Sequence, residues 1–134
     1  MNDQARIDEF LNGAPHTVVG ASRDRSKIGN QVLRAYVQAG RPVFPVNPGV
    51  DEVEGLKAYP NLASLPTPVH GVSVITPPHV TESIIEQAGS IGVKHIWLQP
   101  GAESEQAVER AKELGMNVIY GGPCILIAFA YRDR

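Results

Sequence analysis

The chain has 134 residues, of which 43% are hydrophobic and 19% are charged, a balance typical of one globular domain with its own core. Its formal net charge of −2 argues against a general nucleic-acid binder, so binding of an anion would depend on a local group of basic residues. The single cysteine, Cys124, excludes disulfides within the chain and, with four scattered histidines, forms no zinc pattern, so no metal site is expected.

The first third of the chain predicts a helix, a strand and a second helix. Residues 3–12 have the apolar spacing of an amphipathic helix, which Asp3 is placed to cap. A β-branched run over 16–20 predicts a strand that stops at Gly20. After a polar loop, apolar residues return at helical spacing over 28–39, and the glycine that follows should end this helix.

The middle of the chain is less regular. Residues 42–46 indicate a strand whose prolines should make its ends irregular. Residues 51–68 are mixed and indicate only a short strand or turn, followed by a poorly formed turn of helix. A clear strand returns over 71–75 and is bounded by a threonine and two prolines.

The last third resumes the alternation, with a helix over 79–89, a strand over 95–98, a helix over 104–114 and a strand over 117–120. Strands that alternate with helices of about ten residues through short joins predict right-handed crossovers and a parallel sheet covered on both faces. The predicted fold class is α/β, with a single doubly wound, Rossmann-like domain over residues 1–134.

The apolar segment 125–130 has no polar alternation, so it does not fit a half-exposed strand. Burial of each of its large side chains would contribute about 1.5–3 kcal/mol, which disfavours leaving them in water. The segment should therefore either cover its own sheet or meet another chain. Because three helices already supply cover, we expect a self-associating protein, most simply a homodimer.

No apolar run is long enough to span a membrane, and the start Met1-Asn2-Asp3-Gln4 lacks the basic residues of a signal peptide. We expect no membrane partner and a cytoplasmic chain.

In a doubly wound sheet, ligands bind beyond the carboxyl ends of the strands, at the point where the strand order reverses. Four loops should meet there: the loop after Gly20, and residues 47–48, 76–78 and 99–101. These loops form the predicted binding crevice.

The loop after the first strand indicates a phosphorylated ligand. Gly20 lets the backbone approach the ligand, and the N–H groups of the helix start point at an anion. Arg23, Arg25 and Lys27 favour a ligand with several phosphates. Asn47 stands where dinucleotide sites usually carry an acidic residue for the ribose, which weakens an NAD hypothesis without excluding it.

Six motifs in chain order carry a resemblance to a known family. They are Val18-Val19-Gly20-Ala21-Ser22, Lys27-Ile28-Gly29, Pro45-Val46-Asn47-Pro48, Tyr59-Pro60-Asn61-Leu62, Thr76-Pro77-Pro78 and Trp97-Leu98-Gln99-Pro100-Gly101. From about residue 7 to Cys124 the chain resembles the stand-alone CoA-binding domain family, which is similar to the N-terminal domain of the succinyl-CoA synthetase α subunit.

The resemblance implies coenzyme A as the cofactor and assigns a place to most candidate contacts. It puts Gly20, Ala21, Ser22 and Lys27 at the CoA diphosphate, Asn47 and Pro48 at the adenosine end, Thr76, Pro77 and Pro78 against the pantetheine arm, and Gln99 and Gly101 at the far side of the crevice. Arg23, Ile28 and Val80 complete the candidate set.

Two features depart from the family pattern. Members often carry Asp-Arg-Cys where this chain has Gly121-Gly122-Pro123-Cys124, so the basic group expected there is missing. The segment 125–130 is also more apolar than the resemblance leads us to expect. We do not expect the synthetase's second domain, with its phosphorylated histidine, in this chain, so ligase activity is not expected of it.

No catalytic residue is assigned. Cys124 has no basic partner nearby in sequence, and His79, which follows the two prolines, has no acidic neighbour with which to form a triad. His16 and His95 stand at strand starts, away from the predicted crevice, and Trp97 should lie in the core.

Four functions remain open. The first is a non-catalytic module that binds CoA or acyl-CoA. The second is an NAD(P)-binding oxidoreductase or redox sensor, which would need a ribose-binding acid and a substrate domain. The third is an acyl-transfer enzyme that uses Cys124 or His79. The fourth is an interaction subunit of an ATP-dependent acyl-CoA synthetase, docked through the segment 125–130.

Overall fold

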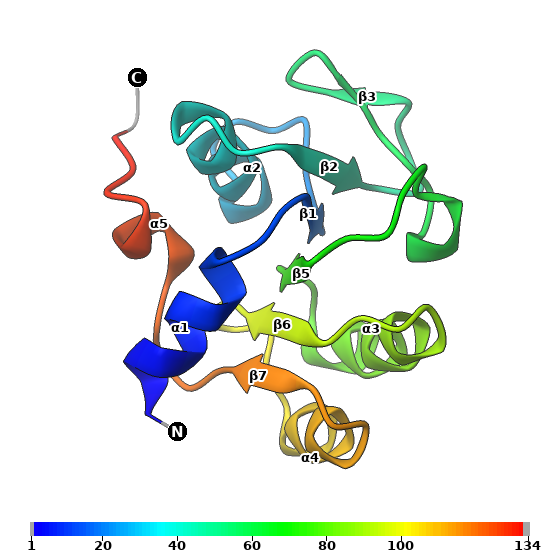
Figure 1. The fold of residues 1–134 in the computed structure, drawn as a ribbon. Coiled ribbons are helices and arrows are strands. Elements are labelled where there is room, and N and C mark those ends of the chain that lie inside the picture. The colour runs from blue at the N-terminus through cyan, green and yellow to red at the C-terminus, as the bar shows by residue number, and fades with distance from the viewer. Residues whose placement is uncertain (1, 133–134) are drawn as a thin grey trace.

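The computed structural model describes residues 2–132, which form a five-stranded parallel sheet with helices on both faces (Figure 1). The strands lie in the order β2-β1-β5-β6-β7. Their bounds are β1 His16–Val19, β2 Val43–Val46, β5 Gly71–Val74, β6 His95–Leu98 and β7 Asn117–Ile119. The predicted doubly wound α/β class is confirmed.

Helices cover the sheet in two layers (Figure 1). Three of them, α1 (Asp3–Leu11), α2 (Ile28–Gln38) and the short α5 (Ile125–Ala128), lie on one face. On the other face lie α3 (Pro78–Ser90) and α4 (Glu105–Glu113), with a 3-10 turn, η1 (Leu62–Ser64), against α3. Because both faces are covered, almost every residue of the three inner strands, β1, β5 and β6, is buried, as is usual for a parallel sheet.

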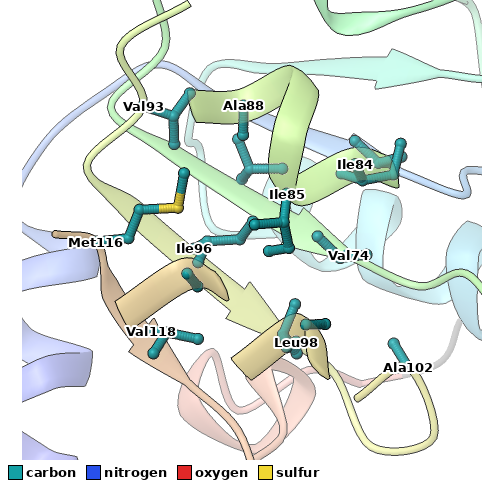
Figure 2. Packing of buried hydrophobic residues seen from close by; sticks show 14 of the residues in the cluster. Val74, Ile84, Ile85, Ala88, Val93, Ile96, Leu98, Ala102, Met116 and Val118 are labelled. Carbon is teal, nitrogen blue, oxygen red and sulfur yellow. The ribbon is translucent and has the colours of Figure 1, made fainter. Parts of the chain in front are cut away.

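Successive side chains along the strands point to opposite faces of the sheet and so contribute to two hydrophobic cores. Trp97 and Ile119 pack on the α1 and α2 side, and Trp97 is fully buried, as predicted. Their neighbours along the strands point to the opposite face. Figure 2 shows how the second core joins α3 to the strands through Ile84, Ile85, Ala88, Val74, Ile96, Leu98 and Val118.

The irregular stretch after β2 contains two elements that the sequence indicated only vaguely. Strands β3 (Glu52–Val53) and β4 (Leu56–Lys57) form an antiparallel hairpin, and η1 spans Leu62–Ser64. Strand β2 is one of the two outer strands of the main sheet, which explains why it tolerates Pro45.

Two helix starts differ from the predicted ones. Asn2, not Asp3, caps α1, since its side chain accepts a hydrogen bond from the Ala5 N–H at 2.8 Å. Helix α3 begins at Pro78, one residue before the predicted start, with Pro77 as its cap residue. Pro suits the first helical position because it has no N–H to satisfy there.

The apolar segment 125–130 folds back onto its own chain. Ile125 is fully buried, and the Phe129 ring packs edge-on against the Tyr36 ring of α2, with centroids 5.0 Å apart. Leu126 is half-buried in the same core, whereas Ile127 is 82% exposed. The expectation of a homodimer rested on several uncovered apolar side chains, and the structure leaves only Ile127 of this segment's large ones uncovered.

Within residues 2–132, no helix combines the length and the apolar character needed to cross a membrane.

Candidate functional site

A cavity of about 410 Å³ lies at the carboxyl ends of β1, β2 and β5. The chain leaves β1 toward β2 on one side and later returns to β5 on the other, so this is the point where strand order reverses. Its lining residues are Val19, Gly20, Ala21, Val46, Asn47, Pro48, Pro60, Asn61, Thr76, Val80, Ile84 and Gln87.

Gly20 lies in the cavity lining, at the turn directly after β1. Its φ is +98°, a conformation that favours glycine, and its N–H donates to the Val46 carbonyl at 3.2 Å. A Cβ at Gly20 would collide with the Ile75 carbonyl oxygen, and a Cβ at Gly29 would collide with the Gly20 carbonyl oxygen. The two glycines therefore bring β1, the end of β5 and the start of α2 into close backbone contact.

Asn47 holds two walls of the cavity together. Its Nδ2 donates to the Ala21 carbonyl at 2.8 Å, and its Oδ1 accepts from the Gly49 N–H at 2.7 Å. The amide thus ties the loop after β1 to the turn after β2. Pro48, next to it, is exposed at the rim.

The basic loop lies beside the cavity and contacts the β3–β4 hairpin. Arg23 Nε donates to the Glu52 carbonyl at 2.9 Å, and Arg25 pairs with the Glu54 carboxylate at 2.8 Å. Lys27 is exposed immediately before α2, with extended backbone and no side-chain cap. The geometry therefore directs the two arginines toward the hairpin and leaves Lys27 at the helix start.

The cavity itself is apolar and carries no charge. Every residue that lines it belongs to the described part of the chain, and none of them is acidic, basic or histidine. The polar groups are the amides of Asn47, Asn61 and Gln87 and the Thr76 hydroxyl, which lies 2.7 Å from the Thr81 hydroxyl. Such a site suits an uncharged ring or chain, with any anionic group outside on the loop.

The predicted contacts divide into three sets. Those that line the cavity are Gly20, Ala21, Asn47, Pro48, Thr76 and Val80. Those beside it, on the loop and the starts of α2 and α3, are Ser22, Arg23, Lys27, Ile28, Pro77 and Pro78. Those that the structure does not bring to the cavity lining are Gln99 and Gly101.

Gln99 points away from the predicted crevice. It is 1% exposed, and its Oε1 accepts from the Ile125 N–H at 3.0 Å, so its side chain holds the start of α5. Gly101 follows in an exposed turn. Neither position shares the cavity because the α3 helix, rather than the loop after β6, supplies that wall.

Sequence reasoning missed six lining residues, two of which, Val19 and Val46, are the last residues of β1 and β2. Ile84 and Gln87 lie on the same face of α3 as Val80, at spacings of four and three residues, and this helical period could have identified them. Pro60 and Asn61 come from the segment after the hairpin. That segment was among the motifs of the resemblance, but nothing local in the sequence placed it at the carboxyl edge of the sheet.

The groups considered for catalysis lie elsewhere. Half-buried Cys124 lines a separate hollow with Trp97 and Leu11, between α1 and α5. His79 is exposed on the first turn of α3. Within residues 2–132, no group of three or more His, Cys, Asp or Glu side chains is arranged to hold a metal ion.

The sheet order and the cavity at its reversal point define a doubly wound α/β ligand-binding domain. More narrowly, the chain belongs to the CoA-binding domain family, whose model matches residues 16–130. The resemblance noted from the six sequence motifs is thereby confirmed.

Relatives of two sizes share this domain. The chain is 29% identical over 130 residues to the ADP-forming acetate–CoA ligase II subunit alpha of Pyrococcus furiosus, across 89% of this chain but only 28% of that protein. It is 31% identical over 128 residues to the uncharacterized protein YneT of Bacillus subtilis, across 95% of this chain and 94% of that one. This chain therefore corresponds to little more than a quarter of the ligase subunit.

Solved structures give the same fold. A conserved hypothetical protein from Pyrococcus furiosus is 36% identical and superimposes with a TM-score of 0.82, across 87% of this chain and 99% of that one. The Rossmann-like fold class is thus supported independently of the sequence motifs.

Proposed function

We propose that this chain binds coenzyme A or an acyl-CoA in the cavity at the β1–β5 reversal point and has no catalytic role on its own. The observation that carries the proposal is the position of an apolar, uncharged cavity directly beside a glycine turn, a basic loop and the start of α2. CoA combines the same features, because an uncharged ring and a flexible arm flank its phosphates.

The division of the site suggests how the ligand lies. The cavity lining offers amide groups and apolar surface for an uncharged part of CoA. The anionic part would then lie at the loop, where the start of α2 has no side-chain cap and Lys27 is exposed. Backbone N–H groups at a helix start favour a phosphate.

CoA should raise the melting temperature of the purified protein more than NAD or NADP does. At a hundred times its dissociation constant, a ligand stabilises the folded state by about 2.7 kcal/mol, which thermal unfolding detects readily. Asn47 stands where an acidic side chain would hold the NAD ribose, so NAD should give little shift. Stabilisation by NAD, with none by CoA or acetyl-CoA, would favour the oxidoreductase hypothesis.

Lys27→Ala should weaken CoA binding by about 1–3 kcal/mol, the range of charge-assisted hydrogen bonds, and leave the melting temperature without ligand unchanged. Isothermal titration calorimetry measures the affinity. Lys94→Ala is the matched control, because Lys94 is also exposed but precedes β6, at the opposite edge of the sheet. Equal affinities of the two variants would remove Lys27 from the site.

A second candidate is an interaction subunit of an ATP-dependent acyl-CoA synthetase. It is favoured by the match to an acetate–CoA ligase subunit that is much longer than this chain. Exposed Ile127 on α5 is one side chain through which another chain could be contacted. A homodimer also stays a prediction, in which Ile127 would lie in the contact between the two copies. Light scattering of the wild type and of Ile127→Ser measures the molar mass of each in solution.

A further inference from the structure

The tip of the β3–β4 hairpin has a backbone conformation that is unusual for its sequence. Glu54 and Gly55 have φ angles of +49° and +79°, the signs of a type I′ turn. Asn, Asp and Gly are the residues that adopt this conformation readily, and glutamate is not among them. A residue in such a sparsely populated conformation persists only where the surrounding structure holds it there.

The Glu54 carboxylate is held by two donors from the other side of the loop. Its Oε1 accepts from Arg25 Nη1 at 2.8 Å, and its Oε2 accepts from Asn30 Nδ2 at 3.1 Å. Arg25 belongs to the basic loop, and Asn30 is a buried residue in the first turn of α2. One carboxylate thus joins the hairpin to the basic loop and to the first turn of α2.

Further hydrogen bonds extend this connection through the loop backbone. Asn30 Nδ2 also donates to the Ser22 carbonyl at 2.8 Å, and Asn30 Oδ1 accepts from Arg34 Nε at 2.7 Å. Arg34 Nη2 donates to the Arg25 carbonyl at 2.8 Å. Since two loop carbonyls are held in place, the path of residues 21–27 depends on side chains outside the loop.

We infer that Glu54 is a positioning residue for the anion-binding loop. It does not contact CoA; it holds Arg25 and Asn30 so that residues 21–27 keep one conformation in which Lys27 and the N–H groups at the start of α2 face the phosphates. The inference rests on the proposed CoA site for its functional part, while the effect on the loop itself does not require a ligand.

Glu54→Asn separates positioning from simple turn stability. Asparagine suits the positive φ at the hairpin tip, so the turn should form at least as well. Its side chain is one methylene shorter, so the paired contacts with Arg25 and Asn30 should be lost. Glu52→Gln is the matched control, because it removes the same charge from the same hairpin while only the Glu52 backbone carbonyl contacts Arg23.

Hydrogen exchange without ligand, melting temperature and CoA affinity are measured on the wild type and both variants. For Glu54→Asn we expect an unchanged or higher melting temperature, amide exchange over residues 21–27 faster by about tenfold, and CoA affinity lower by about tenfold. Glu52→Gln should match the wild type in all three. Glu54→Gln, which keeps the length of the side chain, should restore part of the exchange protection.

Unchanged exchange over residues 21–27 in Glu54→Asn would overturn the positioning role, whatever the CoA affinity. Faster exchange of the loop with an unaltered CoA affinity would overturn the functional part of the inference, because the loop conformation would then not affect binding. A wild-type chain that does not bind CoA would overturn the proposed function instead, and the exchange measurement, made without ligand, would still decide what Glu54 does to the loop.

Discussion

Gly20→Ala is expected to destabilise the fold by about 4 kcal/mol and to lower the melting temperature by roughly 10–20 °C. Two costs add at this position. The backbone has a φ of +98°, which an alanine adopts only with strain, and the new Cβ would collide with the Ile75 carbonyl oxygen. Since this oxygen belongs to the backbone at the end of β5, it has little freedom to move, and any CoA binding should be lost with the turn.

Gly101→Ala is the matched control. Gly101 has a similar φ of +93° but has open space where a Cβ would stand. Its substitution should cost only the backbone strain, about 1–2 kcal/mol. Thermal and urea unfolding of the two variants compare these costs. Equal losses would show that close packing at Gly20 contributes nothing and that the glycine serves the turn alone.

The folded state should lose about 3 kcal/mol of stability through His16 as the pH falls from about 6.5 to about 4. His16 is 1% exposed; burial, and next the neighbouring His70, lower its pKa from 6.5 to about 4. Its Nδ1 lies 2.8 Å from the Tyr36 hydroxyl, and its buried Nε2 has no hydrogen-bond partner in the described structure. Burial outweighs the backbone groups of Gly13 and Phe10, which alone would raise the pKa of this ring.

The direction of the effect follows from proton binding in the two states. Between the folded and unfolded pKa values, the unfolded chain binds a proton on His16 that the folded chain does not. The contribution is therefore fully present above about pH 6.5 and is lost as the pH falls toward 4. The pKa of His95 is also lowered by burial and by His70, which adds in the same direction.

Urea unfolding between about pH 7.5 and about pH 4.5 measures this loss. In His16→Phe the loss should be smaller, because the ring keeps its edge-on contact with Phe10, 4.5 Å between centroids, but no longer titrates. Tyr36 retains Ser73 as a hydrogen-bond partner, at 2.9 Å. His79→Gln, a histidine substitution at an exposed position, is the control. An equally steep loss in His16→Phe would assign the acid sensitivity to other groups.

The sequence by itself determined the elements of the main sheet and most of its helices. Periodicity and turn residues act within a few positions, so the run over 16–20 and the helical spacing over 28–39 predicted β1 and α2 to within a residue or two. Alternation of strands and helices then determined the parallel sheet, because short crossovers allow few other arrangements. Gly20 was identified for the same local reason, since a strand stopped there.

Only the tertiary structure decided which side chains share the cavity and which partners they have. Arg25 contacts Glu54, and Gln99 contacts the Ile125 N–H; these residues stand 29 and 26 positions apart along the chain. No periodicity links such pairs, because they meet through the packing of separate elements. The apolar segment 125–130 shows the same limit: its composition required burial, but whether its own α2 or another chain would cover it depended on space left beside the sheet.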